Sequence, residues 1–313
     1  MKNKLFFFFI LFLFVLVSLL CLNSDSTETN ITIVDKNKNS YNLEVSLQYE
    51  IKVNNREILE PSLEVRLLEN NEHQKITDYF WEVLINESNY SSANYSTFYY
   101  YESKTGKWDF KSINRDSNVS LKLKYNLETN NTYQNPLNDS INIDNRIYIL
   151  PSGGIESDNP KIIELSQKIT EGNSNDVEKI QRLYEYVSKL EYQEDKDGRG
   201  SALKCLERGG GDCDNKAFLL CALLRAQNIP ARPVFGFIYG EKIAHTWVEV
   251  YVGQWLNVDP TNKNFFYLPA RYVKLTSGNG YYDLVTVYYK TNSTYENEIK
   301  IKDIKFEIVE INN

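Results

Sequence analysis

Three residues in the stretch 209–260 have the types and the order that cysteine-based acyl transfer needs. Cys213 follows a glycine run and precedes the apolar run 217–224, so its thiol lies at the start of a predicted helix. Free backbone N–H groups and the positive end of the helix dipole stabilise a thiolate there. His245 opens one predicted strand and Asp259 closes the next. Together they predict a nucleophile, a base and a carboxylate that orients the base.

The predicted strands restrict how His245 and Asp259 can meet. His245 and Trp247 share one face of their strand, because side chains alternate along a strand. A two-residue hairpin loop would place Asp259 opposite Val248, on the wrong face. A three- or five-residue loop places Asp259 opposite Trp247, about 7 Å or less from His245 between Cβ atoms. We therefore expect an odd-length loop or a bulge between these strands.

The sequence around these residues resembles the transglutaminase-like superfamily. The matching blocks are Gly-Asp-Cys-Asp-Asn-Lys-Ala at 211–217, Leu-Leu-Arg-Ala at 223–226, Ile-Pro-Ala-Arg at 229–232, His-Thr-Trp-Val-Glu-Val-Tyr at 245–251 and Trp-Leu-Asn-Val-Asp-Pro-Thr at 255–261. The resemblance implies a papain-like fold with Cys213, His245 and Asp259 as a catalytic triad. Asp214 stands where animal cross-linking members have a tryptophan, and this is similar to the prokaryotic branch. That branch resembles peptidases and amidases.

The resemblance and the triad favour a cysteine peptidase or amidase that works through a thioester. We expect its substrate to be an amide or isopeptide bond in a protein or peptide, such as one of the cell envelope. No cofactor and no metal site is expected, since Cys-x-x-Cys and His-x3-His spacings are absent from the sequence. Three alternatives stay open: protein-glutamine amine transfer, hydrolysis of a glycan–asparagine amide, and a non-catalytic adhesion or scaffold protein.

The N-terminal segment predicts export. Residues 5–22 are apolar apart from Ser18 and follow Lys2 and Lys4. Their length suffices for a membrane-spanning helix, and no small-x-small cleavage site follows them. We therefore expect residues 1–24 to be a membrane anchor, with a cleaved signal or a lipid-modified Cys21 as alternatives. Lysines on the inside place the rest of the chain outside the cytoplasm.

Composition limits the partners and the number of domains. The chain has 313 residues, of which 42% are hydrophobic, and a net charge of −7. This length allows two moderate globular domains. The acidic charge and the lack of a Lys/Arg cluster argue against nucleic-acid binding. The bias toward Ile, Lys, Asn and Tyr is typical of an AT-rich prokaryote such as an archaeon.

The periodicity of the chain predicts an α+β protein of two domains. Residues 25–150 contain short alternating segments and Asn-rich turns, which indicate an all-β sandwich-like domain. After a linker at 145–158, residues 151–275 form the transglutaminase-like domain, and we expect 276–313 to be strands that complete or flank it. The helix from Cys213 to about Gln227 is apolar on nearly all sides, so it should be the buried central helix.

Several single residues also carry expectations. Trp247 and Trp255 should wall the substrate site, although packing explains Trp255 equally well. Arg232 should be structural, and His73, in a polar loop, should be a solvated surface histidine. A bridge between Cys205 and Cys221 is allowed outside the cytosol but is not established by the sequence.

Overall fold

The computed structural model describes residues 35–311 apart from 36, 55–56, 101, 138–142, 196–199, 281–284 and 291–298. The predicted anchor at 5–22 lies outside the described residues. Within the described part of the chain, no helix is both long and apolar enough to cross a membrane.

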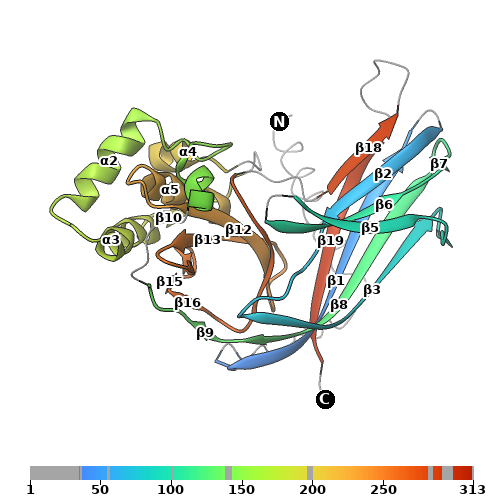
Figure 1. Ribbon diagram of the computed structural model, residues 1–313, viewed down its shortest axis with the longest axis horizontal. Coiled ribbons are helices and arrows are strands. Elements are labelled where there is room, and N and C mark those ends of the chain that lie inside the picture. Colours follow the sequence, from blue (N-terminus) through green and yellow to red (C-terminus); the bar gives the residue numbers. More distant parts are fainter. Residues whose placement is uncertain are drawn as a thin grey trace, which may run out of the picture. The chain divides into compact units, whose positions relative to one another are not determined.

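Two antiparallel sheets form the first part of the fold (Figure 1). The first has the order β19-β1-β8-β3-β4 and the second the order β18-β2-β6-β5, with β7 paired to β2. Their strands are β1 (Ser40–Val53), β2 (Ile58–Arg66), β3 (Gln74–Ile85), β4 (Ser88–Asn89), β5 (Asn94–Tyr100), β6 (Ser103–Asp109), β7 (Ser112–Ile113), β8 (Asn118–Asn130), β18 (Val285–Lys290) and β19 (Ile299–Glu310). The ring of Trp81 on β3 lies 5.7 Å from that of Trp108 on β6, so aromatic side chains join the two sheets.

The last two strands differ from our expectation for residues 276–313. β19 pairs antiparallel with β1, from Leu43 opposite Glu310 to Val53 opposite Ile299, and β18 pairs with β2. Figure 1 shows these red strands beside the blue ones. They extend the N-terminal sheets instead of completing or flanking the helical part. The physical reason is that β8 covers only one edge of β1, and β19 covers the other, so that no long edge of β1 stays unpaired.

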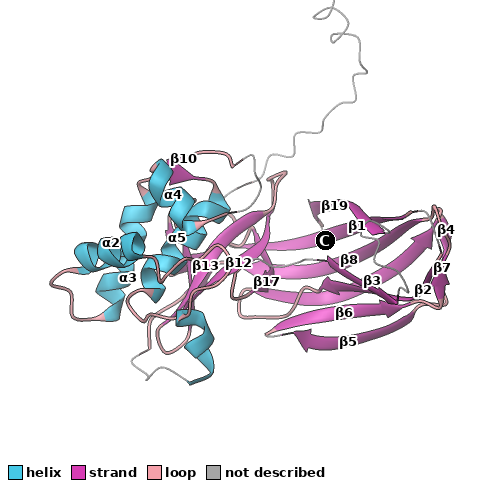
Figure 2. Cartoon of the chain, turned by 90° about the horizontal axis from the view of Figure 1, so that it is seen from above, coloured by secondary structure: helices cyan, strands magenta, loops and turns pink. Residues whose placement is uncertain are grey.

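The second part of the fold has helices against a third antiparallel sheet (Figure 2). The helices are η1 (Ile143–Ile149, a 3-10 helix), α2 (Pro160–Thr170), α3 (Asp176–Ser188), α4 (Ala202–Arg208) and α5 (Cys213–Arg225). The sheet has the order β15-β14-β13-β12-β17, built from β12 (Ala231–Ile238), β13 (His245–Tyr251), β14 (Trp255–Asp259), β15 (Asn264–Phe265) and β17 (Tyr272–Ser277). Two short pairs complete it: β10 (Glu191–Tyr192) with β11 (Gly210–Gly211), and β9 (Thr132–Tyr133) with β16 (Tyr267–Leu268).

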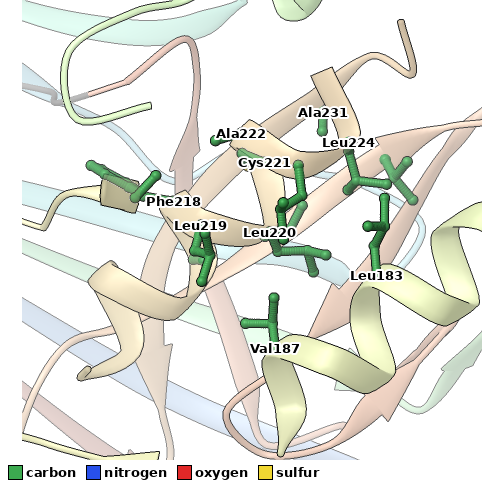
Figure 3. Packing of buried hydrophobic residues seen from close by; sticks show 14 of the residues in the cluster. Leu183, Val187, Phe218, Leu219, Leu220, Cys221, Ala222, Leu224 and Ala231 are labelled. Carbon is green, nitrogen blue, oxygen red and sulfur yellow. The ribbon is translucent and has the colours of Figure 1, made fainter. Parts of the chain in front are cut away.

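Helix α5 is the centre of this part, as the apolar run predicts. Every residue from Asn215 to Arg225 is buried. Leu183 and Val187 of α3 point toward Leu220 of α5 (Figure 3), and all three are fully buried. Each such side chain stabilises the fold by about 1.5–3 kcal/mol relative to an exposed one. The packing of this helix therefore fixes the position of its first residue, Cys213.

Candidate active site

Local sequence places Cys213 at the first position of α5. Gly209 ends α4 in the left-handed region at φ 70°, which glycine adopts without strain. A Cβ at Gly211 would collide with the side chain of Asn215, so glycine is also needed for this close approach. The carboxylate of Asp212 then caps α5 by accepting the backbone N–H of Asn215 at 3.0 Å.

The hairpin between β13 and β14 brings His245 and Asp259 together. Residues 252–254 form a three-residue loop, and Val248 lies opposite Val258. This confirms the predicted odd-length loop, because it places Asp259 on the same face of the sheet as His245. His245 Nε2 lies 2.7 Å from Asp259 Oδ2.

Asp259 is buried but well supplied with hydrogen-bond donors. Its Oδ1 accepts the backbone N–H groups of Thr261 at 2.8 Å and Asn262 at 3.0 Å. Its Oδ2 accepts from His245 and, at 2.7 Å, from the hydroxyl of Tyr272. Burial by itself raises the pKa of Asp259, but these hydrogen bonds and the charge of His245 outweigh it and lower the pKa. The group is therefore a carboxylate at neutral pH.

Cys213 and His245 share the wall of one cavity of about 180 Å³. Its other lining residues are Tyr192, Ile238, Glu241, Ile243, Ala244, Thr261 and Asn262. The cavity thus contains the predicted nucleophile and the predicted base, while Asp259 lies behind the histidine. Because Asp259 binds Nε2, the ring nitrogen of His245 left for other partners is Nδ1.

The thiol of Cys213 differs electrostatically from the sequence expectation. Burial and, after it, the charge of the Asp214 carboxylate, whose Oδ1 lies 3.8 Å from Sγ, raise its pKa to about 12. The backbone N–H of Thr246 acts in the opposite direction, but it does not compensate. Burial, more than the negative charge beside the sulfur, therefore opposes formation of the thiolate. The resting thiol is protonated at neutral pH.

The two tryptophans lie elsewhere than expected. Trp247 is fully buried and stacks on His245 with ring centroids 6.1 Å apart, so it supports the imidazole without lining the cavity. Trp255 lines a separate cavity, where the Arg232 guanidinium lies 3.9 Å from its ring centroid. Sequence spacing could not separate these roles, because both residues lie on adjacent strands of the same sheet.

The other cysteines of the described residues and His73 also have defined places. Cys205 and Cys221 are buried free thiols, so they form no bridge. Within the described residues, no group of three His, Cys, Asp or Glu side chains is arranged to hold a metal ion. The prediction of a solvated His73 is wrong. The ring is buried, with Nε2 2.8 Å from the Tyr272 carbonyl oxygen, and burial lowers its pKa to about 4.

Tyr272 is the functional candidate that the sequence did not reveal. It follows Asp259 by 13 positions, and its phenol bonds the carboxylate directly. No motif marks it, because tyrosine is frequent in this chain, with 23 copies. Only the antiparallel packing of β17 on the far side of β12 brings it to the site.

Comparisons with known proteins show what the sequence and the fold are similar to. Residues 163–260 match the model of the transglutaminase-like superfamily. The uncharacterized protein ML0607 of Mycobacterium leprae is 31% identical over 108 residues, which cover 31% of this chain and 38% of that protein. This chain therefore matches well under half the length of that relative.

Two solved structures are also similar. A candidate cysteine protease from Cytophaga hutchinsonii has a TM-score of 0.64 at 17% identity. The match covers 88% of this chain and 92% of the Cytophaga chain. The periplasmic domain of TgpA from Pseudomonas aeruginosa, bound to ethylmercury, has a TM-score of 0.37 at 14% identity over 72% of this chain and 91% of its own. The second score is too low to establish a common fold, whereas the first does so. Residues 163–260 are therefore a transglutaminase-like core, set in a fold that the chain shares with the Cytophaga protein.

Proposed function

We propose that the protein is a cysteine-nucleophile acyl-transfer enzyme that hydrolyses amide or isopeptide bonds in proteins or peptides. One observation carries the proposal. His245 is held by Asp259 at 2.7 Å on the wall of the cavity that also contains Cys213. A nucleophile, a base and a group that orients the base are the parts that such catalysis needs.

The raised pKa of Cys213 decides how the thiol is activated. A thiol that is protonated at rest must lose its proton as it attacks, so His245 acts as a general base through Nδ1. Asp259 keeps the proton on Nε2 and stabilises the imidazolium that forms. The route differs from a preformed thiolate–imidazolium pair, because burial of the thiol and, after it, the charge of Asp214 disfavour a resting thiolate.

The proposed reaction then proceeds in two halves. Sγ attacks the carbonyl carbon, and the oxygen takes up the negative charge near the Cys213 backbone N–H at the start of α5. The His245 imidazolium gives its proton to the leaving amine, the C–N bond breaks, and a thioester on Cys213 remains. A water molecule, deprotonated by His245, attacks the thioester and releases the acid and the thiol.

We place the reaction outside the cytoplasm. The support is the apolar segment 5–22 with Lys2 and Lys4 before it, a pattern that also makes the membrane a partner of the chain. Substrates would then be proteins or peptides of the cell envelope or its surroundings.

A peptide-library experiment tests the proposed function. The protein is incubated with diverse peptides and side-chain-linked isopeptides, with and without a fluorescent primary amine, and products are sequenced by mass spectrometry. We expect new carboxyl ends that Cys213→Ala does not produce. Incorporation of the amine in place of water would assign amine transfer. Identical product patterns for the wild type and Cys213→Ala would contradict the proposal and favour a scaffold role.

A further inference from the structure

The phenol of Tyr272 can donate its hydrogen to one partner only. Its oxygen accepts from Asn262 Nδ2 at 2.9 Å and from Asn264 Nδ2 at 3.0 Å. A phenol has two acceptor positions and one hydrogen. With both acceptor positions filled, the hydrogen points to Asp259 Oδ2 at 2.7 Å. The neighbouring amides therefore fix the direction of this hydrogen bond.

The ring that carries the hydroxyl is also fixed. Tyr272 is fully buried and packs edge-on against His245, with centroids 5.8 Å apart, and against Trp247, with centroids 5.4 Å apart. Burial and the Asp259 carboxylate raise the pKa of Tyr272, so the phenol keeps its hydrogen at every physiological pH. A single residue thus contacts the imidazole and its carboxylate together.

The N-terminal part of the fold holds Tyr272 from the other side. His73, which directly precedes β3, places Nε2 2.8 Å from the Tyr272 carbonyl oxygen, and its Nδ1 lies 3.2 Å from Thr132 Oγ1. With a pKa of about 4, the ring is neutral above that pH. Its Nε2–H then donates to the carbonyl, because a carbonyl oxygen only accepts. The backbone of Tyr272 is anchored where its side chain reaches the site.

We infer that Tyr272 is a positioning residue for His245 and Asp259, and that the N-terminal sheets anchor it through His73. Its hydroxyl and the imidazole share Oδ2, so the phenol restrains the carboxylate and takes part of its charge. Without the hydroxyl, the carboxylate would rotate more freely and would stabilise the imidazolium more strongly. The inference rests on the proposed function for His245 as the base.

Histidine NMR tests this arrangement without requiring turnover. The chain has two histidines, His73 and His245, so the two ring signals can be followed separately. In Tyr272→Phe, which keeps the ring, we expect the titration midpoint of His245 to rise by about 0.5–1 pH unit. The matched control Tyr49→Phe removes another buried phenol, in β1. We expect Tyr49→Phe to leave the titration midpoint of His245 unchanged.

Kinetics supply the second measurement. We expect Tyr272→Phe to lower kcat for an activated ester by about 10–100-fold, with little change in KM, because a hydrogen bond to a charged group is lost. The acid limb of the pH profile should move upward with the NMR midpoint. An unchanged midpoint and an unchanged kcat would overturn the inference and leave the phenol a packing role. If the wild type has no turnover, the proposed function fails, while the midpoint still decides the positioning role.

A milder variant covers the case in which Tyr272→Phe does not fold. Asn264→Ala removes one amide that fills an acceptor position of the phenol and leaves the ring in place. We expect a smaller upward shift of the His245 midpoint, because a phenol oxygen that accepts one hydrogen bond fewer donates more weakly to Asp259. A midpoint equal to that of the wild type in this variant would equally overturn the inference.

Discussion

Replacing Asp259 by asparagine is expected to lower kcat/KM for an activated ester or amide by about 10³–10⁴-fold. The amide fills the same space, and its oxygen can still accept the backbone N–H groups of Thr261 and Asn262. Its NH2 group then faces His245 Nε2, which must become an acceptor. The proton moves to Nδ1, and the ring can no longer take the thiol proton of Cys213.

The experiment compares steady-state kinetics and thermal unfolding of the variant with those of Asp176→Asn. Asp176 is exposed at the start of α3, where its carboxylate lies 3.4 Å from Lys179 Nζ, so this control should keep full activity. Both variants should remain folded at the assay temperature. An Asp259→Asn protein with activity within tenfold of the wild type would show that the carboxylate does not set the tautomer of His245.

The second large effect is on the stability of the fold and concerns Glu249. Buried Glu249 pairs with Arg232 at 2.8 Å and with Lys274 at 2.5 Å. Burial by itself raises the pKa of Glu249, but Lys274 and Arg232 lower it to about 2. Glu249→Gln leaves buried Arg232 and half-buried Lys274 without this carboxylate. We expect a loss of about 3–5 kcal/mol in the free energy of unfolding.

Urea unfolding at pH 7 measures this loss, with Glu207→Gln as the control. Glu207 forms an exposed pair with Lys161, and such pairs contribute about 0–1 kcal/mol. The pH dependence gives a further check. The pKa is about 2 in the folded state and about 4.3 in the unfolded state. The stabilisation is therefore complete above pH about 4.3 and declines as the pH falls toward 2. A Glu249→Gln midpoint equal to that of Glu207→Gln would contradict this role.

The sequence predicted the parts of the site that depend on local rules. Glycines before Cys213 and the apolar run after it indicate a helix that starts at the cysteine, and α5 does so. The alternation along β13 and β14 was sufficient to require an odd loop, because a shift of one residue would move Asp259 to the other face. These inferences succeed because each depends on residues close together in the chain.

Contacts between segments far apart in the chain could not be predicted from the sequence. His73 sits in a polar loop, yet β17 covers it and supplies a carbonyl partner, so local polarity misled the prediction. Tyr272 lies next to Asp259 because of the strand order of the third sheet. Likewise, β19 pairs with β1 although most of the chain separates them in sequence. The thiol of Cys213 shows the same limit, because its raised pKa comes first from burial, which depends on the packing of the whole fold.

The central claim is that Cys213 forms a covalent acyl intermediate with the help of His245. Its most direct test is acid quenching of the protein during turnover of p-nitrophenyl acetate, followed by peptide mapping by mass spectrometry. We expect an acetyl group on Cys213 that neutral hydroxylamine removes, as it does a thioester, and that is strongly reduced in His245→Gln. A Cys213 that stays unmodified while the ester is consumed, or one that is acetylated equally fast in His245→Gln, would contradict the account.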